Sequence, residues 1–118
     1  MTHISELDPA ALARLDALGG PGLARKIIGI FLSEGPRRLA DARAALGRRD
    51  ADALGLAVHA LISSAGNVGA MGLAEFARNT EQEADAGRWD GLAERLDRMT
   101  EAFETIRVSL EAQRDGRG

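Results

Sequence analysis

The sequence contains no cysteine and no tyrosine, and its aromatic residues are three phenylalanines and one tryptophan. Without cysteine, the chain has no disulfide framework, no thiolate metal site and no cysteine nucleophile. So small a set of aromatic rings also argues against a stacking platform for nucleic-acid bases. The chemistry of this chain therefore rests on other side chains.

A long apolar run is missing as well. No stretch approaches the roughly 18 unbroken apolar residues that cross a bilayer, and the first residues lack the basic segment and apolar run of a secretory signal. The net charge is -3, with acidic and basic residues interspersed, whereas a nucleic-acid binder needs a concentrated basic face. We therefore expect a cytoplasmic protein that binds neither membrane nor nucleic acid.

What the sequence does contain is alanine and leucine at helical spacing. β-Branched residues are few, and alternation with a period of two is missing. A length of 118 residues is typical of one domain. We expect residues 1–118 to form a single all-α domain. Its core would be an antiparallel, up-and-down four-helix bundle over about residues 23–112, with additional N-terminal helical structure and a frayed tail over residues 113–118.

Capping residues and breakers divide the chain into helices. Asp8 followed by Pro9 predicts a helix start, and the glycine-rich residues 19–22 predict its end. Gly35-Pro36 should kink or break the helical pattern between residues 23–34 and 37–47, so that the sequence allows one bent helix or two. Asp50 and Asp90 are candidate N-caps of later helices. The first of them is expected to run from Asp50 to near residues 67–69, and the next from about Met71 to Ala86. The last is expected to follow Asp90, with an apolar stripe from Leu92 to Leu110.

His59 lies on the outer side of the predicted helix that follows Asp50. The stripe expected to be buried consists of Leu54, Val58, Leu61, Ala65 and Val68. At roughly 100° per residue, His59 lies about 150° from the centre of that stripe. Small residues flank it one turn away, at Gly55 and Ser63, and two turns away, at Gly66. A lone imidazole on a bed of small residues suits a nucleophile that another macromolecule must reach.

The run from His59 to Ala70 resembles the phosphorylation motif of histidine phosphotransfer (HPt) domains of two-component signalling. In that motif the histidine is followed by any residue, leucine, lysine, glycine, small residues and a glycine-containing turn. The flanks are also similar and extend the resemblance over most of the chain. They are Ile30-Phe31-Leu32, Pro36-Arg37-Arg38-Leu39, Ala44-Ala45-Leu46 through Asp50, Gly69-Ala70, Leu73-Ala74 and Glu81.

The resemblance implies a phosphorelay intermediate. His59 would accept a phosphoryl group from the aspartyl phosphate of one receiver domain and pass it to the aspartate of another. The receiver would supply Mg²⁺ and most of the catalytic groups, so that the chain would be a phosphocarrier and not an enzyme. The implied partners are response-regulator receiver domains and a sensor or hybrid histidine kinase. They would dock on the exposed side of the helix, around Leu56, Ile62, Ser63 and Gly66.

Two positions depart from the family pattern. Ile62 stands where the family has lysine, whose charge can neutralise phosphoryl oxygens one turn from the histidine, and Ser63 stands where it has glycine. Ile62 is either ordinary rim packing or a hydrophobic contact with the receiver. Ser63 is either a plain surface residue or a hydrogen-bond donor to the phosphoryl group. Because the lysine is absent, an alternative function is an HPt-like adaptor or kinase inhibitor that binds receiver or kinase domains without phosphotransfer.

Glu81 falls where the family often has glutamate or glutamine close to the imidazole. By that resemblance it could accept a hydrogen bond from Nδ1–H, fix the tautomer and leave Nε2 free; otherwise it is a solvated carboxylate. Arg78, one turn earlier, could offer the missing charge or pair with Glu81 or Glu75. His3 is expected in a mobile N-terminus and receives no role. Two histidines without cysteine predict no metal site.

Overall fold

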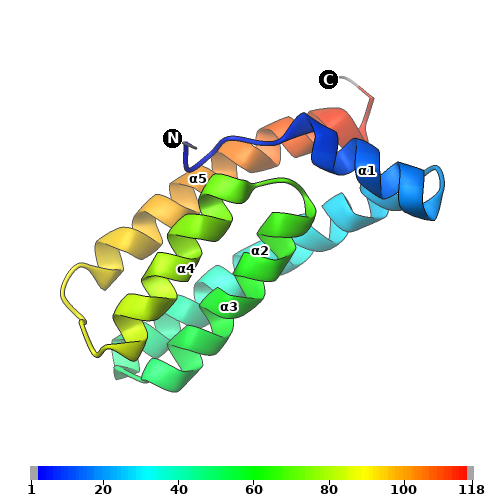
Figure 1. Cartoon of the computed structure of the whole chain (residues 1–118). Helices are drawn as coiled ribbons and strands as arrows, with labels where there is room; N and C mark the ends of the chain where they lie inside the picture. Colours follow the sequence, from blue (N-terminus) through cyan, green and yellow to red (C-terminus); the bar gives the residue numbers. More distant parts are fainter. Residues whose placement is uncertain (1–2, 117–118) are drawn as a thin grey trace.

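The computed structural model describes residues 3–116, and within this range every regular element is a helix. The helices are α1 (Pro9–Gly19), α2 (Leu23–Arg48), α3 (Ala51–Asn67), α4 (Met71–Asp85) and α5 (Leu92–Arg114). The four helices from α2 through α5 are joined in order by short connections and lie side by side as an antiparallel bundle, with α1 at one end (Figure 1). The all-α class and the up-and-down bundle with an additional N-terminal helix are thus confirmed.

The four long helices close into a ring around an apolar interior. α2 packs on α3, α3 on α4, α4 on α5 and α5 on α2, while α1 packs on α2. The rings of Phe31 and Phe103 meet in this interior, with their centroids 5.1 Å apart. α5 alone buries Leu92, Leu96, Met99, Ala102, Phe103, Ile106 and Leu110. One apolar stripe per helix, repeated at helical spacing, is sufficient to fix how each helix is rotated.

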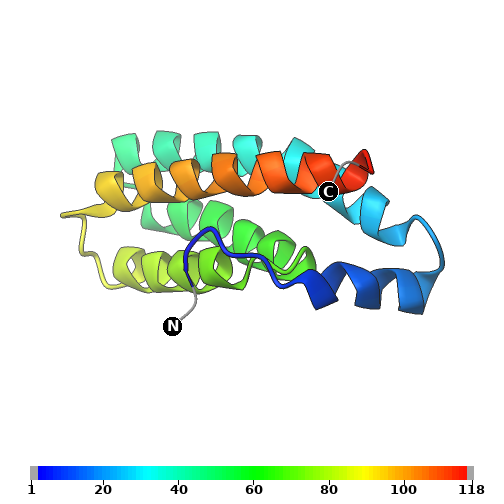
Figure 2. The same cartoon turned by 90° about the horizontal axis from the view of Figure 1, so that it is seen from above.

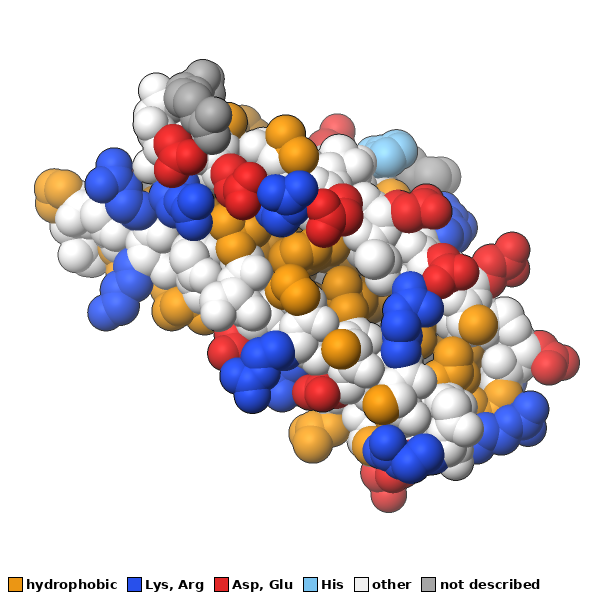
Figure 3. All heavy atoms as spheres, turned by 180° about the vertical axis from the view of Figure 1, so that it is seen from behind, with side chains coloured by type: hydrophobic (Ala, Val, Ile, Leu, Met, Phe, Trp, Pro, Cys, Tyr) orange, Lys and Arg blue, Asp and Glu red, His pale blue; other side chains and the backbone are white. Residues whose placement is uncertain are grey.

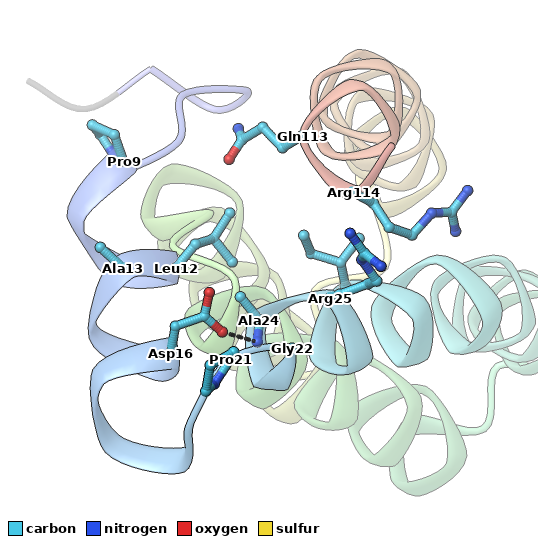
Figure 4. A pocket seen from close by; sticks show the side chains of 11 residues that line it. Pro9, Leu12, Ala13, Asp16, Pro21, Gly22, Ala24, Arg25, Gln113 and Arg114 are labelled. Carbon is cyan, nitrogen blue, oxygen red and sulfur yellow. Dashed lines mark hydrogen bonds between the residues drawn. The ribbon is translucent and has the colours of Figure 1, made fainter. Parts of the chain in front are cut away.

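α1 begins as its sequence predicts and also helps to start α2. Pro9 is its first residue, and the Asp8 carboxylate at the N-cap accepts a hydrogen bond from a backbone amide of the first turn. Further along α1, the Asp16 carboxylate accepts a hydrogen bond of 2.9 Å from the backbone nitrogen of Ala24 (Figure 4). Gly22, the N-cap of α2, has no side chain that could do this. α1 is therefore held beside the beginning of α2, at one end of the bundle (Figure 2).

α2 continues through Gly35-Pro36, so the alternative with two separate helices is excluded. Gly35 is buried against α5, and a Cβ at this position would overlap the ring of Phe103. Pro36 removes one backbone donor inside the helix, and its side chain lies on the exposed side of α2. Packing against the bundle on both sides of this pair keeps α2 in one piece. Gly35 thus serves close packing and not chain reversal.

The segment before α1 lies against the start of α4. Ile4 and Leu7 pack on the hydrophobic core. Gly72, in the first turn of α4, is buried beneath this segment, and a Cβ at Gly72 would overlap the carbonyl oxygen of His3. The backbone of His3 therefore lies on α4, whereas His3 as a whole is exposed, as expected for a residue near the N-terminus. The sequence of this segment alone does not indicate the contact, because it depends on the absence of a side chain at Gly72 in α4.

We expect Gly72→Ala to lower the free energy of unfolding by about 1–3 kcal/mol, the usual cost of forcing a methyl group into a packed site. Urea unfolding measures this change, and hydrogen exchange at the amide of Glu6 should become faster as the segment lifts. Gly47→Ala is the control, because an added Cβ meets nothing within 4 Å there. It should stabilise α2 by up to about 1 kcal/mol. Equal stability of Gly72→Ala and the unsubstituted chain would contradict the contact with His3.

α5 departs from the sequence prediction at both ends. Its N-cap is Gly91, at a φ of 84°, and not Asp90. Glycine reaches this left-handed conformation without steric cost, which explains why the helix begins one residue later than expected. At the other end the helix continues through Gln113 and Arg114, where we expected the frayed tail to begin. Residues 117–118 of that tail lie outside the described range.

Two arginines tie α5 to its neighbours. Arg95 Nε donates to Thr80 Oγ1 on α4 at 2.8 Å, and its guanidinium carbon lies 4.0 Å from the centroid of the Phe76 ring. Burial at this position lowers the pKa of Arg95. On the other side, Arg43 of α2 donates to Asp97 at 2.8 Å. These contacts attach α4 and α2 to α5. α4 carries part of the site described below.

Candidate functional site

α3 presents His59 on its outer side. Asp50 caps the helix as predicted, with its carboxylate accepting a hydrogen bond of 3.0 Å from the backbone nitrogen of Ala53. The predicted stripe is buried throughout, at Leu54, Val58, Leu61, Ala65 and Val68. Because this stripe fixes the rotation of α3, the side chain of His59 points outward and keeps 65% of its surface exposed. The imidazole is therefore within reach of a partner.

The imidazole contacts the carboxylate of Glu81 on α4. Nδ1 of His59 is 3.4 Å from Oε1 and 3.3 Å from Oε2. The two residues meet because α3 and α4 are consecutive, antiparallel and packed on each other. A carboxylate can only accept hydrogen bonds, so Nδ1 must carry the proton shared with Glu81, and the lone pair is then on Nε2. The fold thus brings together two residues that the family resemblance places in one site.

Ile62 is not part of the exposed surface. Its side chain is only 9% exposed and joins the hydrophobic core between α3 and α4. Its assignment to the docking surface is therefore wrong. Three residues after His59, the helix has turned back by about 60° toward α4, and a projection of α3 alone does not show how far the neighbouring helix covers this position. Ile62 contributes packing where the family pattern has a charge.

The other expected docking residues lie on the surface around His59. Leu56 is 74% exposed, and Ser63 is exposed with no side-chain hydrogen bond to any residue in the range 3–116. Gly66 is half-buried, with open space where a Cβ would be. We call these three residues and His59 the docking face. Gly55, by contrast, is buried and faces α4, where an added Cβ would be in ordinary contact with the carboxylate of Asp85.

The two helices of the site contain one cationic side chain and several acidic ones. α3 has no lysine or arginine, and α4 has only Arg78. The acidic residues of the two helices are Asp52, Glu75, Glu81, Glu83 and Asp85. Arg78 is exposed, and its side chain forms no ion pair or hydrogen bond within the described part of the chain. The ordinary surface pair with Glu81 or Glu75 is therefore not formed.

Other parts of the surface are distinct from this site. A cavity of about 570 Å³ lies between α1, the beginning of α2 and the end of α5, and no residue of α3 or α4 lines it (Figure 4). On the face formed by α2 and α5, basic and acidic side chains are interspersed (Figure 3). Residues 3–116 contain no group of three or more metal-binding side chains that could hold an ion. Within the same residues, every helix is too short or too polar to cross a bilayer.

Comparison with known proteins then decides the family. The family model described as Hpt domain matches residues 26–109, well over half of the chain. The chain belongs to the Hpt domain family. This Hpt domain is also similar to histidine-containing phosphotransfer protein B (HptB) from Pseudomonas aeruginosa PAO1. The TM-score is 0.86 at 26% sequence identity, and the match covers 92% of this chain and 94% of that chain. No curated protein matches the chain.

Membership of this family makes the chain a histidine phosphotransfer protein of the phosphorelay type. The matched range includes α3 and α4 completely, so His59 and Glu81 both lie inside it. Proteins of this family interact with receiver domains and kinases. This Hpt domain thus has a buried isoleucine, Ile62, one turn after its exposed His59, and the isoleucine packs in the hydrophobic core.

Proposed function

We propose that this Hpt domain shuttles a phosphoryl group between receiver-domain aspartates and carries it on Nε2 of His59. The observation that carries the proposal is the contact of His59 Nδ1 with Glu81 on an otherwise open surface. The carboxylate selects the tautomer in which Nε2 holds the lone pair and limits the rotation of the ring. An accessible imidazole with a defined tautomer is a nucleophile in position for an incoming phosphoryl group.

The proposed transfer conserves bonds and charge. The lone pair of Nε2 attacks the phosphorus of the aspartyl phosphate, the Nε2–P bond forms, and the P–O bond to the aspartate breaks. The electron pair of the broken bond remains on the aspartate as a carboxylate. The ring is cationic while Nδ1 keeps its proton, and the Glu81 carboxylate balances this charge. Passage to a second receiver reverses these steps with another aspartate.

In this proposal the receiver binds over the docking face. Leu56 offers exposed apolar surface, and the short side chains at Ser63 and Gly66 let the receiver's aspartate approach His59. The Ser63 hydroxyl can donate to a phosphoryl oxygen. The receiver supplies Mg²⁺ and the charged groups around the phosphorus, while this chain supplies a positioned nucleophile. The chain therefore acts as a phosphocarrier. In this proposal it works in the cytoplasm, and a sensor or hybrid kinase phosphorylates the first receiver.

The test is transfer from a receiver domain that carries a labelled aspartyl phosphate. The proposal expects the label to move to this chain, and from it to a second, unlabelled receiver. Acid lability of the label with stability in alkali identifies a phosphorus–nitrogen bond. Binding of the receiver without transfer of label would instead support the adaptor or kinase inhibitor. Absence of both binding and transfer would contradict either function.

Glu81→Ala should slow the acceptance of label by roughly fivefold, the effect expected for a part-exposed hydrogen bond to a group that becomes charged. Glu81→Gln keeps an acceptor for Nδ1–H but lacks the charge, so its rate should be intermediate. Single-turnover transfer at saturating receiver measures these rates. Glu75→Ala, an exposed carboxylate on the same helix, is the control and should be unchanged. An unchanged rate in Glu81→Ala would show that the contact does not orient the ring.

A further inference from the structure

Phosphorylation of His59 adds negative charge to the docking face, which contains no cationic side chain to balance it. A phosphoryl group adds about two negative charges near neutral pH, and the neighbouring Glu81 carboxylate is already within 3.4 Å of the ring. Position 62, which holds a cation in the family pattern, is occupied by a buried isoleucine. Some other cation must lie nearby if the charged phosphoryl group is to be stabilised by this chain.

Arg78 is the one candidate that α3 and α4 offer within the described residues. It precedes Glu81 by three positions, so the two side chains are neighbours on one side of α4, with Cβ atoms roughly 5–6 Å apart. Ile62 follows His59 by the same three positions on α3. Because α3 and α4 are antiparallel, the step from Glu81 to Arg78 and the step from His59 to Ile62 run in the same direction along their seam.

Arg78 therefore stands across the seam from the position where the cation is missing. Its guanidinium has no partner in residues 3–116, although Glu75 and Glu81 lie three positions away on either side. An unpaired arginine is available to a new anion without breaking an existing pair. The planar guanidinium can also donate two parallel hydrogen bonds to phosphoryl oxygens, which the ammonium group of lysine cannot do.

We propose that the guanidinium of Arg78 binds the phosphoryl group on His59, in place of the cation absent at position 62. This inference rests on the proposed function, since it requires phosphorylated His59. The positive charge then comes from the second helix of the site and not from the helix that carries the histidine. The isoleucine at position 62 is free to pack the seam because the charge is supplied across it.

The test uses the full chain phosphorylated by phosphoramidate, a small-molecule donor, so that no receiver contact is involved. The second pKa of the phosphoryl group is followed by phosphorus NMR. A nearby cation favours the dianion and lowers this pKa, so Arg78→Ala should raise it by about half a unit, a threefold change in the equilibrium. Arg78→Lys should recover part of the shift. The difference between Arg78→Ala and the unsubstituted chain should shrink in high salt, because an exposed pair is screened.

Lys26→Ala is the matched control, since it removes another exposed cation that has no side-chain partner in the described residues, from α2. It should leave the phosphoryl pKa unchanged. If the pKa of Arg78→Ala equals that of the unsubstituted chain and the control, Arg78 does not bind the phosphoryl group, while the proposed function stands. Failure of the unsubstituted chain to take up phosphorus, from phosphoramidate or from a receiver, would overturn both. A purely structural role of Arg78 would change the melting temperature without this pKa shift.

Discussion

A chain with His59→Gln takes up no phosphoryl group from a phosphorylated receiver, and we expect a loss of at least about a thousandfold, as for removal of a nucleophile. The amide of glutamine has no lone pair of comparable nucleophilicity, so no phosphorus–nitrogen bond forms. The fold should be unaffected, because the His59 side chain is 65% exposed and its one polar partner within residues 3–116 is the part-exposed Glu81. The free energy of unfolding should stay within about 0.5 kcal/mol, the usual range for a surface substitution.

His3→Gln is the matched control, since His3 is the one other histidine of the chain. It should accept label at the rate of the unsubstituted chain. Peptide mapping of the labelled chain then places the phosphoryl group on the residues of α3. Label on the His59→Gln chain, or loss of label on the His3→Gln chain, would contradict the assignment of the site.

Gly35→Ala should destabilise the bundle by about 1–3 kcal/mol, the range found for overpacked cores. The added methyl group would overlap the ring of Phe103, which is only 2% exposed and packed against Phe31. The ring cannot move aside without disturbing the centre of the α2–α5 contact. This cost outweighs the roughly 1 kcal/mol that alanine gains over glycine inside a helix. Urea or thermal unfolding measures the difference.

Gly29→Ala, on the same helix, separates packing from helix propensity. A Cβ at Gly29 meets nothing within 4 Å, so this substitution should stabilise the chain by up to about 1 kcal/mol. Adding Phe103→Leu to Gly35→Ala should recover part of the lost stability, because the smaller side chain leaves room for the methyl group. If Gly35→Ala is as stable as Gly29→Ala, the close packing of α2 on α5 at this point is refuted.

Much of the fold follows from local patterns in the sequence. The caps at Asp8 and Asp50 and the apolar stripe of α3 were readable, because each depends on residues within one or two turns. Gly35-Pro36 was ambiguous, since a breaker inside a helix is overcome by packing against α5, which no local pattern reveals. The N-cap of α5 is Gly91 and not Asp90, and this depends on a backbone conformation that sequence alone does not specify.

The candidate site shows the same division between local and tertiary information. The exposure of His59 follows from the stripe on its own helix. The burial of Ile62 does not, because it depends on how closely α4 approaches. No local pattern predicts the contact of Glu81 with the imidazole, because 22 positions separate the two residues. The family resemblance is what indicates it from the sequence. The sequence also does not show that Arg78 lacks a side-chain partner among residues 3–116, because two acidic residues stand within one turn of it.

The contact between α3 and α4 also bears on how the protein folds. The site is built from one helical hairpin, whose short connection closes a small loop at low entropic cost. The contact of Gly35 with Phe103, in contrast, joins helices far apart along the chain and forms only when the whole bundle closes. Contacts between neighbouring segments form fast, and distant ones slowly. The geometry around His59 is therefore set by the most local part of the topology, and substitutions that loosen the α2–α5 closure should reduce stability before they disturb the nucleophile.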